Sequence, residues 1–352
     1  MSTNAAINAM SSIPIYTSVA SYREWRRKAF EERKTVGFVA TMGALHEGHI
    51  SLVKRSLAEN DLTVVSIFVN PAQFAPHEDL ATYPRTLPQD LELLSAQSFS
   101  VRNKDGVQVK EIRKPSAVFL PTVEAMYPSG ISQNTNEQKG TFVEVKGYSH
   151  QMEGGTRPTF FRGVATVVTK LFNAIEPTNA YFGQKDIQQA LLLRRLSRDI
   201  LLSHPEPEHV HIVPTARDPS SGLALSSRNA YLTKDGLQVA PTLYKALRAA
   251  ERTWSNGSTK AEAIEEAIGV VEREKIRAHE SGIQANVRLD YVEFNNSADF
   301  EVIDSELTKI TASPHPVILS GALWVDGTRL IDNLILGDAG SIVNDVAGNV
   351  AS

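Results

Sequence analysis

Two glycines and two histidines stand within residues 41–49 (TMGALHEGH), where an apolar run gives way to a helical pattern. Gly43 and Gly48 let the backbone approach a ligand closely. The first turn of the helix offers free N–H groups and a positive dipole end, and His46 and His49 can face the same side of it. This combination predicts a turn that binds the phosphates of a nucleotide.

Two other interpretations of this segment stay open. The histidines could bind zinc, or a histidine at the helix start could hydrogen-bond to the backbone. A catalytic zinc site needs three protein ligands, no third ligand follows at a recognisable spacing, and Glu47 lies off the face of the two histidines. The segment has neither the lysine and spacing of a P-loop nor a G-x-G-x-x-G pattern, which argues against Walker-type hydrolysis and Rossmann hydride transfer.

A second polar group lies at the end of another apolar run, in residues 66–74 (SIFVNPAQF), and is followed by YPRT at 83–86 and by Asp90. Asn70 and Gln73 carry uncharged amides that both donate and accept hydrogen bonds, which suits the orientation of a hydroxy-acid substrate. The alternative is a proline-stabilised turn that the amides cap.

The third group is in residues 183–189 (GQKDIQQ), again between a strand pattern and a helical pattern. Lys185 is a mobile cation suited to a phosphate, Asp186 is favourable in a first helical turn, and Gln189 follows about one turn later. Asp186 as a plain N-cap is the simpler alternative.

The fourth group is in residues 222–229 (GLALSSRN). Ser226 and Ser227 beside Arg228 form a candidate phosphate clamp, because a guanidinium makes bidentate contacts with phosphate oxygens. A solvated loop is the alternative for this segment alone. Four phosphate-suited groups along one chain favour the functional interpretation.

The elements that must position these groups follow an alternating pattern. Apolar runs at 36–42 and 62–69 flank a helical pattern with Ile50, Val53 and Leu57 on one face, which predicts a βαβ unit. Continuous apolar strands suit a parallel sheet covered on both faces. A second round of helix, strand, helix and strand follows at 163–175, 179–183, 186–202 and 209–215, so we expect an α/β fold with a Rossmann-like, doubly wound parallel sheet.

After Pro214 the pattern changes to two long helices at 234–253 and 260–279, followed by strands at 287–294, 317–325 and 328–336, which predicts a smaller C-terminal α+β domain. Further predictions are a polar surface insertion at about 97–116 with an Asp105-Gly106 turn, and a loop at 127–140 before a strand at 142–145. The expected domains are a tail at 1–14, a ligand-binding domain at 15–213, a smaller domain at 214–336 and a tail at 337–352.

Composition limits the class of protein. The chain has 352 residues, a net charge of −4 and no cysteine, which argues against a nucleic-acid scaffold and excludes disulfides, thiolate metal sites and cysteine nucleophiles. No apolar stretch approaches the ~18 to 20 residues of a membrane helix, so we expect no membrane association. The N-terminal residues contain no arginine before Arg23, so a cytoplasmic location is expected and a mitochondrial one is a minor alternative.

The motifs TMGALHEGH, SIFVNPAQF, YPRT, FRGVATVVTKLFN, YFGQKDIQQ and LALSSRNAYL occur in this order between about residues 36 and 336. Together they closely resemble the pantothenate synthetases, a pantoate–β-alanine ligase family of the nucleotidylyltransferase superfamily with its His-x-Gly-His signature. The resemblance implies a homodimer with a C-terminal lid. It also implies that pantoate is activated by MgATP to pantoyl adenylate, which β-alanine converts to pantothenate and AMP.

The resemblance also implies roles for individual residues. ATP is expected along Met42, Gly43, His46, Gly48, His49, Gly183, Gln184, Lys185, Asp186, Ala216, Leu225, Ser226, Ser227 and Arg228. Catalysis is assigned to His46, His49, Lys185, Ser226, Ser227 and Arg228, with His49 the candidate proton donor. Substrate contacts are assigned to Thr41, Met42, Asn70, Gln73 and Gln189, and Asp90 is the candidate ligand of Mg²⁺.

The sequence departs from the family pattern at two places. Ala40 replaces the proline that usually precedes Thr-Met-Gly, and Thr159-Phe160 stands where Gly-His is usual. Two alternative functions are an adenylyltransferase that acts on another acceptor, from which AMP would not be released, and a catalytically silent nucleotide-binding protein. The intact basic and hydroxyl groups argue against the silent protein, and the Gln73 and Gln189 pair, suited to a carboxylate with hydroxyls, argues against the adenylyltransferase.

Overall fold

The computed structural model describes residues 11–75, 80–102, 108–311 and 315–343. Most of both predicted tails and the Asp105-Gly106 turn lie outside these residues. The chain divides into two compact units, described separately below. The first comprises Met1–Gly183 and Gln189–Val213, and the second comprises Gln184–Gln188 and Pro214–Ser352.

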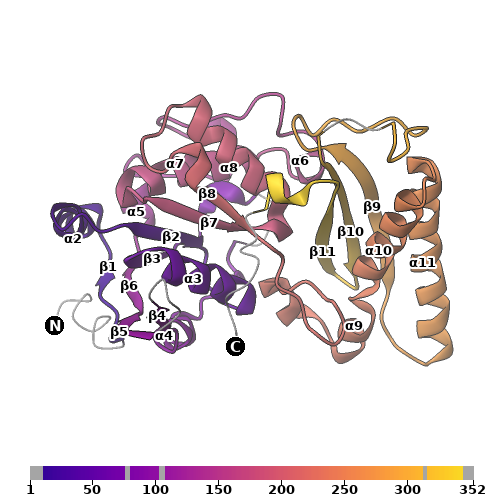
Figure 1. Cartoon of the computed structure of the whole chain (residues 1–352), viewed down its shortest axis with the longest axis horizontal. Coiled ribbons are helices and arrows are strands. Elements are labelled where there is room, and N and C mark those ends of the chain that lie inside the picture. Colours follow the sequence, from indigo (N-terminus) through magenta and orange to yellow (C-terminus); the bar gives the residue numbers. More distant parts are fainter. Residues whose placement is uncertain (1–10, 76–79, 103–107, 312–314, 344–352) are drawn as a thin grey trace. The chain divides into compact units, whose positions relative to one another are not determined.

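The first unit contains a six-stranded parallel sheet in the order β1-β6-β3-β2-β7-β8 (Figure 1). These strands are β1 (Ile15–Tyr16), β2 (Val36–Thr41), β3 (Leu62–Ile67), β6 (Pro115–Phe119), β7 (Asn179–Gly183) and β8 (Val210–Val213). The chain builds outward from β2 to β3 and β6, then returns to add β7 on the other side of β2. The carboxyl ends of β2 and β7 therefore meet at the point where the strand order reverses, which is where open α/β sheets bind ligands.

Helices cover both faces of this sheet (Figure 1). Helices α3 (Glu47–Glu59) and α4 (Leu87–Ser95) lie on one face, where Ile50, Val53 and Leu57 pack with Leu91 and Leu94 against Val39, Val65 and Val118. The remaining helices are α2 (Val19–Glu31), α5 (Val123–Met126), α6 (Glu153–Thr156), α7 (Phe160–Ile175) and α8 (Ile187–Asp199). The predicted α/β class, the βαβ unit and the parallel sheet are confirmed.

A two-stranded antiparallel ribbon, β4 (Phe99–Arg102) and β5 (Gln108–Arg113), lies in the predicted insertion. Neither β1 nor β6, the strand that follows this ribbon, was predicted from the sequence patterns. The predicted strand at 142–145 is wrong. The backbone N–H of Val143 donates to Thr166 Oγ1 (3.0 Å), and the same hydroxyl donates to the Val143 carbonyl oxygen (3.3 Å). The Thr166 side chain on α7 therefore takes the place of the backbone hydrogen bonds that a neighbouring strand would make.

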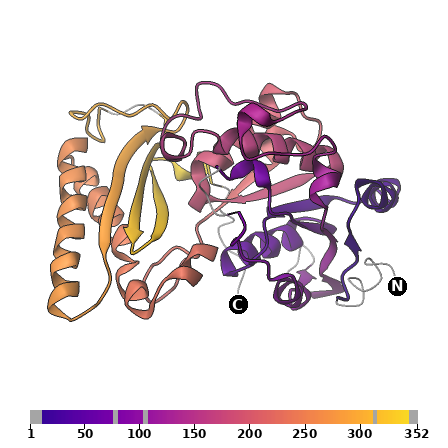
Figure 2. The same ribbon diagram turned by 180° about the vertical axis from the view of Figure 1, so that it is seen from behind.

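The second unit has a three-stranded antiparallel sheet in the order β11-β10-β9, and Figure 2 shows helices α10 and α11 running along it. Its strands are β9 (Val287–Asn296), β10 (Val317–Val325) and β11 (Thr328–Leu336), and its helices are α9 (Lys234–Val239), α10 (Thr242–Ser255) and α11 (Lys260–Glu280). The predicted α+β character is confirmed. The single helix expected at 234–253 is wrong, because Pro241 lacks an N–H and separates α9 from α10.

Among the described residues, none of the helices combines the length and the apolar character needed to cross a membrane.

Candidate active site

The turn after β2 is built from two successive left-handed residues. Gly43 has φ +83° and Ala44 has φ +50°, a conformation that glycine adopts without steric cost. The buried Thr41 side chain fixes the start of the turn, since its hydroxyl donates to the Ser66 carbonyl oxygen (2.8 Å) and accepts from the Gly43 N–H (3.2 Å). The turn is therefore anchored to β3 before the histidines begin.

Asp90 anchors the rest of this turn from α4. Its Oδ2 accepts from the Ala44 N–H (3.1 Å), and its Oδ1 accepts from the Leu45 N–H (2.8 Å) and the Thr86 hydroxyl (3.1 Å). The residue is 1% exposed. The expected magnesium ligand thus has both oxygens engaged with the turn, a contact that the spacing of the residues does not reveal.

The two histidines lie together at the start of α3. His46 is the N-cap, and its Nδ1 accepts from the Gly48 N–H (3.0 Å). The neutral ring therefore carries its proton on Nε2. The ring centroids of His46 and His49 are 4.1 Å apart. The capping alternative holds for His46, and it coexists with the predicted arrangement of both rings on one side.

Among the residues that the structure describes, the zinc alternative finds no third ligand. Within residues 11–75, 80–102, 108–311 and 315–343, His, Asp and Glu side chains form no group of three that could hold a metal ion. The histidine pair therefore remains a candidate for contact with phosphate or for proton transfer.

Asn70 and Gln73 meet at the carboxyl end of β3. The Asn70 amide donates to Gln73 Oε1 (2.9 Å) and to the Gly163 carbonyl oxygen (3.2 Å), and its Oδ1 accepts from the Tyr127 hydroxyl (2.6 Å). Burial raises the pKa of Tyr127 far above its ordinary range, which keeps the phenol protonated as the donor. Asn70 is 1% exposed, so its hydrogen bonds orient the side chain of Gln73.

Helix α7 supports the same turn by direct contact between backbones. A Cβ atom on Gly163 would lie 2.1 Å from the Ala72 carbonyl oxygen, so only glycine fits there. Arg157 Nη2 donates to the Gln73 carbonyl oxygen (3.1 Å), and its guanidinium lies 3.9 Å from the Phe160 ring. Phe160, one of the two departures from the family pattern, thus packs on the arginine that holds Gln73.

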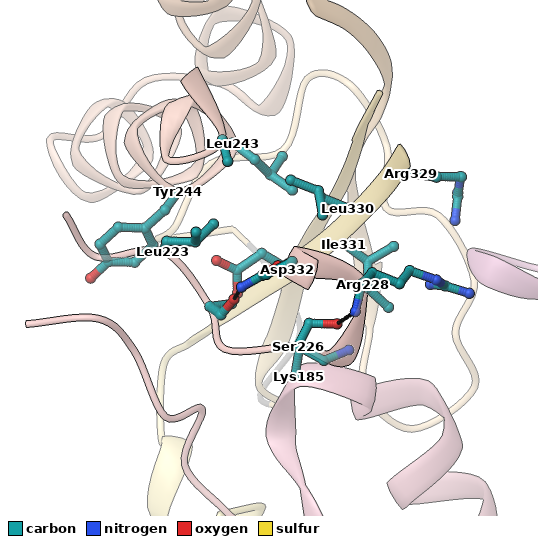
Figure 3. Close-up of a pocket in the computed structure, with 13 residues that line it drawn as sticks. Lys185, Leu223, Ser226, Arg228, Leu243, Tyr244, Arg329, Leu330, Ile331 and Asp332 are labelled. Carbon is teal, nitrogen blue, oxygen red and sulfur yellow. Dashed lines mark hydrogen bonds between the residues drawn. The ribbon is translucent and has the colours of Figure 1, made fainter. Parts of the chain in front are cut away.

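Two predicted groups meet in the second unit. Lys185, in the 3₁₀ turn Gln184–Asp186, lines one pocket with Ser226 and Arg228 (Figure 3). Arg329, Asp332 and Tyr244 line the same pocket. Three cationic side chains give its lining the charge that suits a phosphate.

Local hydrogen bonds hold these residues in place. Lys185 Nζ lies 3.1 Å from Asp186 Oδ2. Ser226 is the N-cap of a 3₁₀ turn that begins at Ser227, and its hydroxyl accepts from the Arg228 N–H (3.3 Å). These two segments are about 40 residues apart in sequence, and the structure brings them to one pocket.

The other predicted positions are found on the same two units. In the first unit, Met42 and Gly48 are partly exposed in the β2–α3 segment, Gly183 ends β7, and Gln189 is partly exposed in the first turn of α8. In the second unit, the Leu225 N–H donates to the Ala216 carbonyl oxygen (3.0 Å). The sequence did not indicate Arg157, Tyr127, Arg217, Asp332 or Asn333, because each acts through a contact with a residue distant in sequence.

Comparisons with known proteins show the family of this chain. The family model described as pantoate-beta-alanine ligase matches residues 14–335. The pantoate–beta-alanine ligase of Saccharomyces cerevisiae is 40% identical over 92% of this chain and 99% of its own length, and the pantothenate synthetase of Herpetosiphon aurantiacus is 42% identical with the same coverage.

Solved structures give the same result. The crystal structure of pantothenate synthetase from Thermus thermophilus aligns with a TM-score of 0.70 and 36% identity over 92% of this chain and 99% of that one. The ligase of Francisella tularensis, solved with beta-gamma ATP and beta-alanine, aligns with a TM-score of 0.65 and 29% identity over 92% of this chain and 98% of that one. The chain belongs to the pantoate–β-alanine ligase family.

Proposed function

We propose that this chain catalyses the ATP-dependent condensation of (R)-pantoate with β-alanine to give (R)-pantothenate, AMP and diphosphate. The observation that carries the proposal is the alignment of nearly the whole chain with a ligase solved in complex with beta-gamma ATP and beta-alanine. The geometry agrees with it, because both units present cationic or imidazole groups beside structured turns.

In the first step, a carboxylate oxygen of pantoate bonds to the α-phosphorus of ATP, and the bond from that phosphorus to the bridging oxygen breaks to release diphosphate. The barrier falls through positioning of the reactants and stabilisation of the phosphate charge. We assign this task to His46 and His49 in the first unit, and to the lysine, serine and arginine side chains of the second-unit pocket (Lys185, Ser226, Ser227 and Arg228).

In the second step, the β-alanine amine attacks the acyl carbon of pantoyl adenylate and expels AMP. Gln73 and Gln189 are assigned to pantoate, since amides hydrogen-bond its hydroxyls and carboxylate without adding charge. Asn70 assists by orienting Gln73. Thr41 and Met42 are also assigned to the substrate, although the Thr41 hydroxyl already bonds to Ser66 and Gly43.

We propose that Mg²⁺ enters as part of the MgATP substrate. Asp90 does not fit the role of a resident metal ligand, because it is buried and its two oxygens accept three hydrogen bonds. We therefore assign Asp90 to the support of the turn that carries His46.

The test is to measure AMP and diphosphate released from MgATP and pantoate, with and without β-alanine, and to identify the product by mass spectrometry. Pantothenate and AMP that appear only when pantoate and β-alanine are both present establish the ligase. Release of diphosphate without AMP, even when β-alanine is present, would establish an adenylyltransferase instead. Binding of ATP without turnover would establish a silent nucleotide-binding protein.

We also propose a cytoplasmic homodimer, on the basis of the family resemblance. Light scattering coupled to gel filtration should give twice the mass of 38.6 kDa. A mass of one chain across the working concentration range would contradict the dimer.

A further inference from the structure

Strand β11 contacts the turn that carries Lys185. The Asn333 amide Nδ2 donates to the carbonyl oxygens of Gln184 (2.8 Å) and Lys185 (3.0 Å), and its Oδ1 accepts from Gln184 Nε2 (3.2 Å). Asn333 is 1% exposed. This amide is therefore committed to the lysine turn, defined as residues Gln184–Asp186.

The preceding residue of β11 contacts a different segment. The Asp332 carboxylate accepts two hydrogen bonds from the Arg217 guanidinium (2.5 and 2.9 Å). Burial raises the pKa of Asp332, and Arg217 acts in the opposite direction. Arg217 also donates to the Gly222 carbonyl oxygen (3.2 Å) and stacks 4.0 Å from the Tyr244 ring.

Arg217 belongs to a short hairpin that leads into the serine–arginine segment, defined as residues 226–228. An antiparallel bridge joins Arg217 to Ala224, and the Leu225 N–H donates to the Ala216 carbonyl oxygen. Ser226 follows directly. The placement of the serine–arginine segment therefore depends on the hairpin that Asp332 holds through Arg217.

We propose that Asp332 and Asn333 are positioning residues for the reaction, which hold the serine–arginine segment and the lysine turn from one strand. Adjacent residues of a strand point to opposite faces of the sheet, which is why neighbours in sequence reach two separate segments. The inference rests on the proposed function, because the spacing matters to catalysis only if Lys185 and Arg228 bind the nucleotide. A misplacement of about 1 Å can lower a rate by ~100-fold.

The first test is Asn333→Asp in the full-length chain. The substitution keeps the size of the side chain, but it places an acceptor oxygen against the carbonyl oxygens of the lysine turn. We expect kcat/KM for ATP to fall ~10-fold or more, while KM for pantoate changes less than about twofold.

The matched control is Asn295→Asp in the same unit. Asn295 is also 1% exposed, and its Nδ2 donates to the Phe300 carbonyl oxygen (2.8 Å). Both variants should lower Tm, but the control should leave KM for ATP unchanged. If Asn333→Asp resembles the control in its kinetics, the inference is overturned.

A double variant separates the inference from the proposed function. On a Lys185→Ala background, Asn333→Asp should lower activity less than about threefold further, because the lysine through which Asn333 acts is gone. A full additive loss would overturn the inference. Retention of activity by Lys185→Ala alone would instead remove Lys185 from the proposed mechanism and leave the ligase activity standing.

A milder variant covers the case in which Asn333→Asp does not fold. Arg217→Lys keeps the charge opposite Asp332 but loses the bidentate contact and its link to Gly222. We expect kcat/KM for ATP to fall ~3 to 10-fold with KM for pantoate unchanged. Unaltered kinetics with ATP would contradict the role of Asp332.

Discussion

The histidine turn of the first unit and the pocket of the second unit are both held by a buried carboxylate, but in different ways. Asp90 accepts hydrogen bonds directly from the backbone N–H groups of the turn, 45 and 46 residues away in sequence. Asp332 acts through the side chain of Arg217, 115 residues away. In the first unit the carboxylate therefore bonds the backbone of the turn directly, whereas in the second unit it acts through a second side chain, that of Arg217.

The largest expected effect is the loss of the groups that contact phosphate. His49→Ala in the first unit and Lys185→Ala in the second should each lower adenylate formation by more than ~100-fold, because each removes charge stabilisation or proton donation. Diphosphate release from MgATP and pantoate measures the step. Lys275→Ala is the control, since Lys275 pairs with Glu272 on the surface of α11. Near-normal turnover in either active-site variant would remove that residue from the mechanism.

The next largest effect is expected when the direct contact between Asp90 and the turn of the first unit is lost. Asp90→Asn replaces one acceptor oxygen by an NH₂ group that faces a backbone N–H, so we expect a stability loss of about 1–3 kcal/mol and a ~10 to 100-fold fall in kcat. Urea unfolding and steady-state kinetics measure the two quantities.

Asp61→Asn is the matched control for that variant. Asp61 also accepts from a backbone N–H and a hydroxyl, both of Thr35 (2.9 Å each), but it lies at the amino end of β3. It should lose stability and keep kcat. If Asp61→Asn and Asp90→Asn lower kcat equally, the position of Asp90 at the turn has no special role.

A smaller effect tests the indirect support in the second unit. Gly222 has φ +78°, and a Cβ atom there would lie 2.6 Å from the Tyr244 ring on which Arg217 stacks. Gly222→Ala should therefore raise KM for ATP several-fold. Gly257→Ala, at φ +96° with no neighbour within 4 Å, isolates the backbone cost of about 1 kcal/mol. If Gly222→Ala and Gly257→Ala have the same KM for ATP, the substitution at Gly222 does not displace the Arg217 guanidinium from the Tyr244 ring.

The smallest effect is a pH dependence in the first unit. Burial lowers the pKa of His211 below its ordinary value of 6.5, and Glu59 partly opposes the shift. The unfolded chain then binds more protons, so the stability from this group is complete above pH 6.5 and is lost as pH falls toward the folded pKa. Between pH 8 and pH 5, the urea midpoint of unfolding should fall less steeply with decreasing pH in His211→Gln than in the unaltered protein. An identical slope in both proteins would contradict the assignment.

The sequence predicted the fold well where local patterns carry the information. The apolar runs at 36–42 and 62–69 and the turn residues between them determine one βαβ unit, and β9, β10 and β11 follow from similar patterns. The predictions failed where a distant or local side chain intervenes. Thr166 satisfies the backbone of Val143 in place of a strand, and Pro241 divides a helix that hydrophobic periodicity alone would continue.

The candidate site was predictable to the same extent. Motifs identified His46, which caps α3, and Lys185 and Arg228, which line one pocket of the second unit. They did not identify Asn333, which lies 148 residues from Lys185, because the contact depends on the pairing of β10 with β11. Nor did they show that Asp90 binds the backbone of the turn.

If Gln73 binds pantoate as proposed above, the direct backbone contact between Gly163 and the Ala72 carbonyl oxygen sets a limit on redesign of the acid specificity. Because no side chain separates α7 from the turn, the depth at which Gln73 presents its amide is set by backbone atoms that no substitution can shorten. Variants that accept a bulkier hydroxy acid must therefore change other walls of the site. A library that randomises Gly163 will yield mainly misfolded proteins, whereas one directed at Gln189 leaves this contact intact.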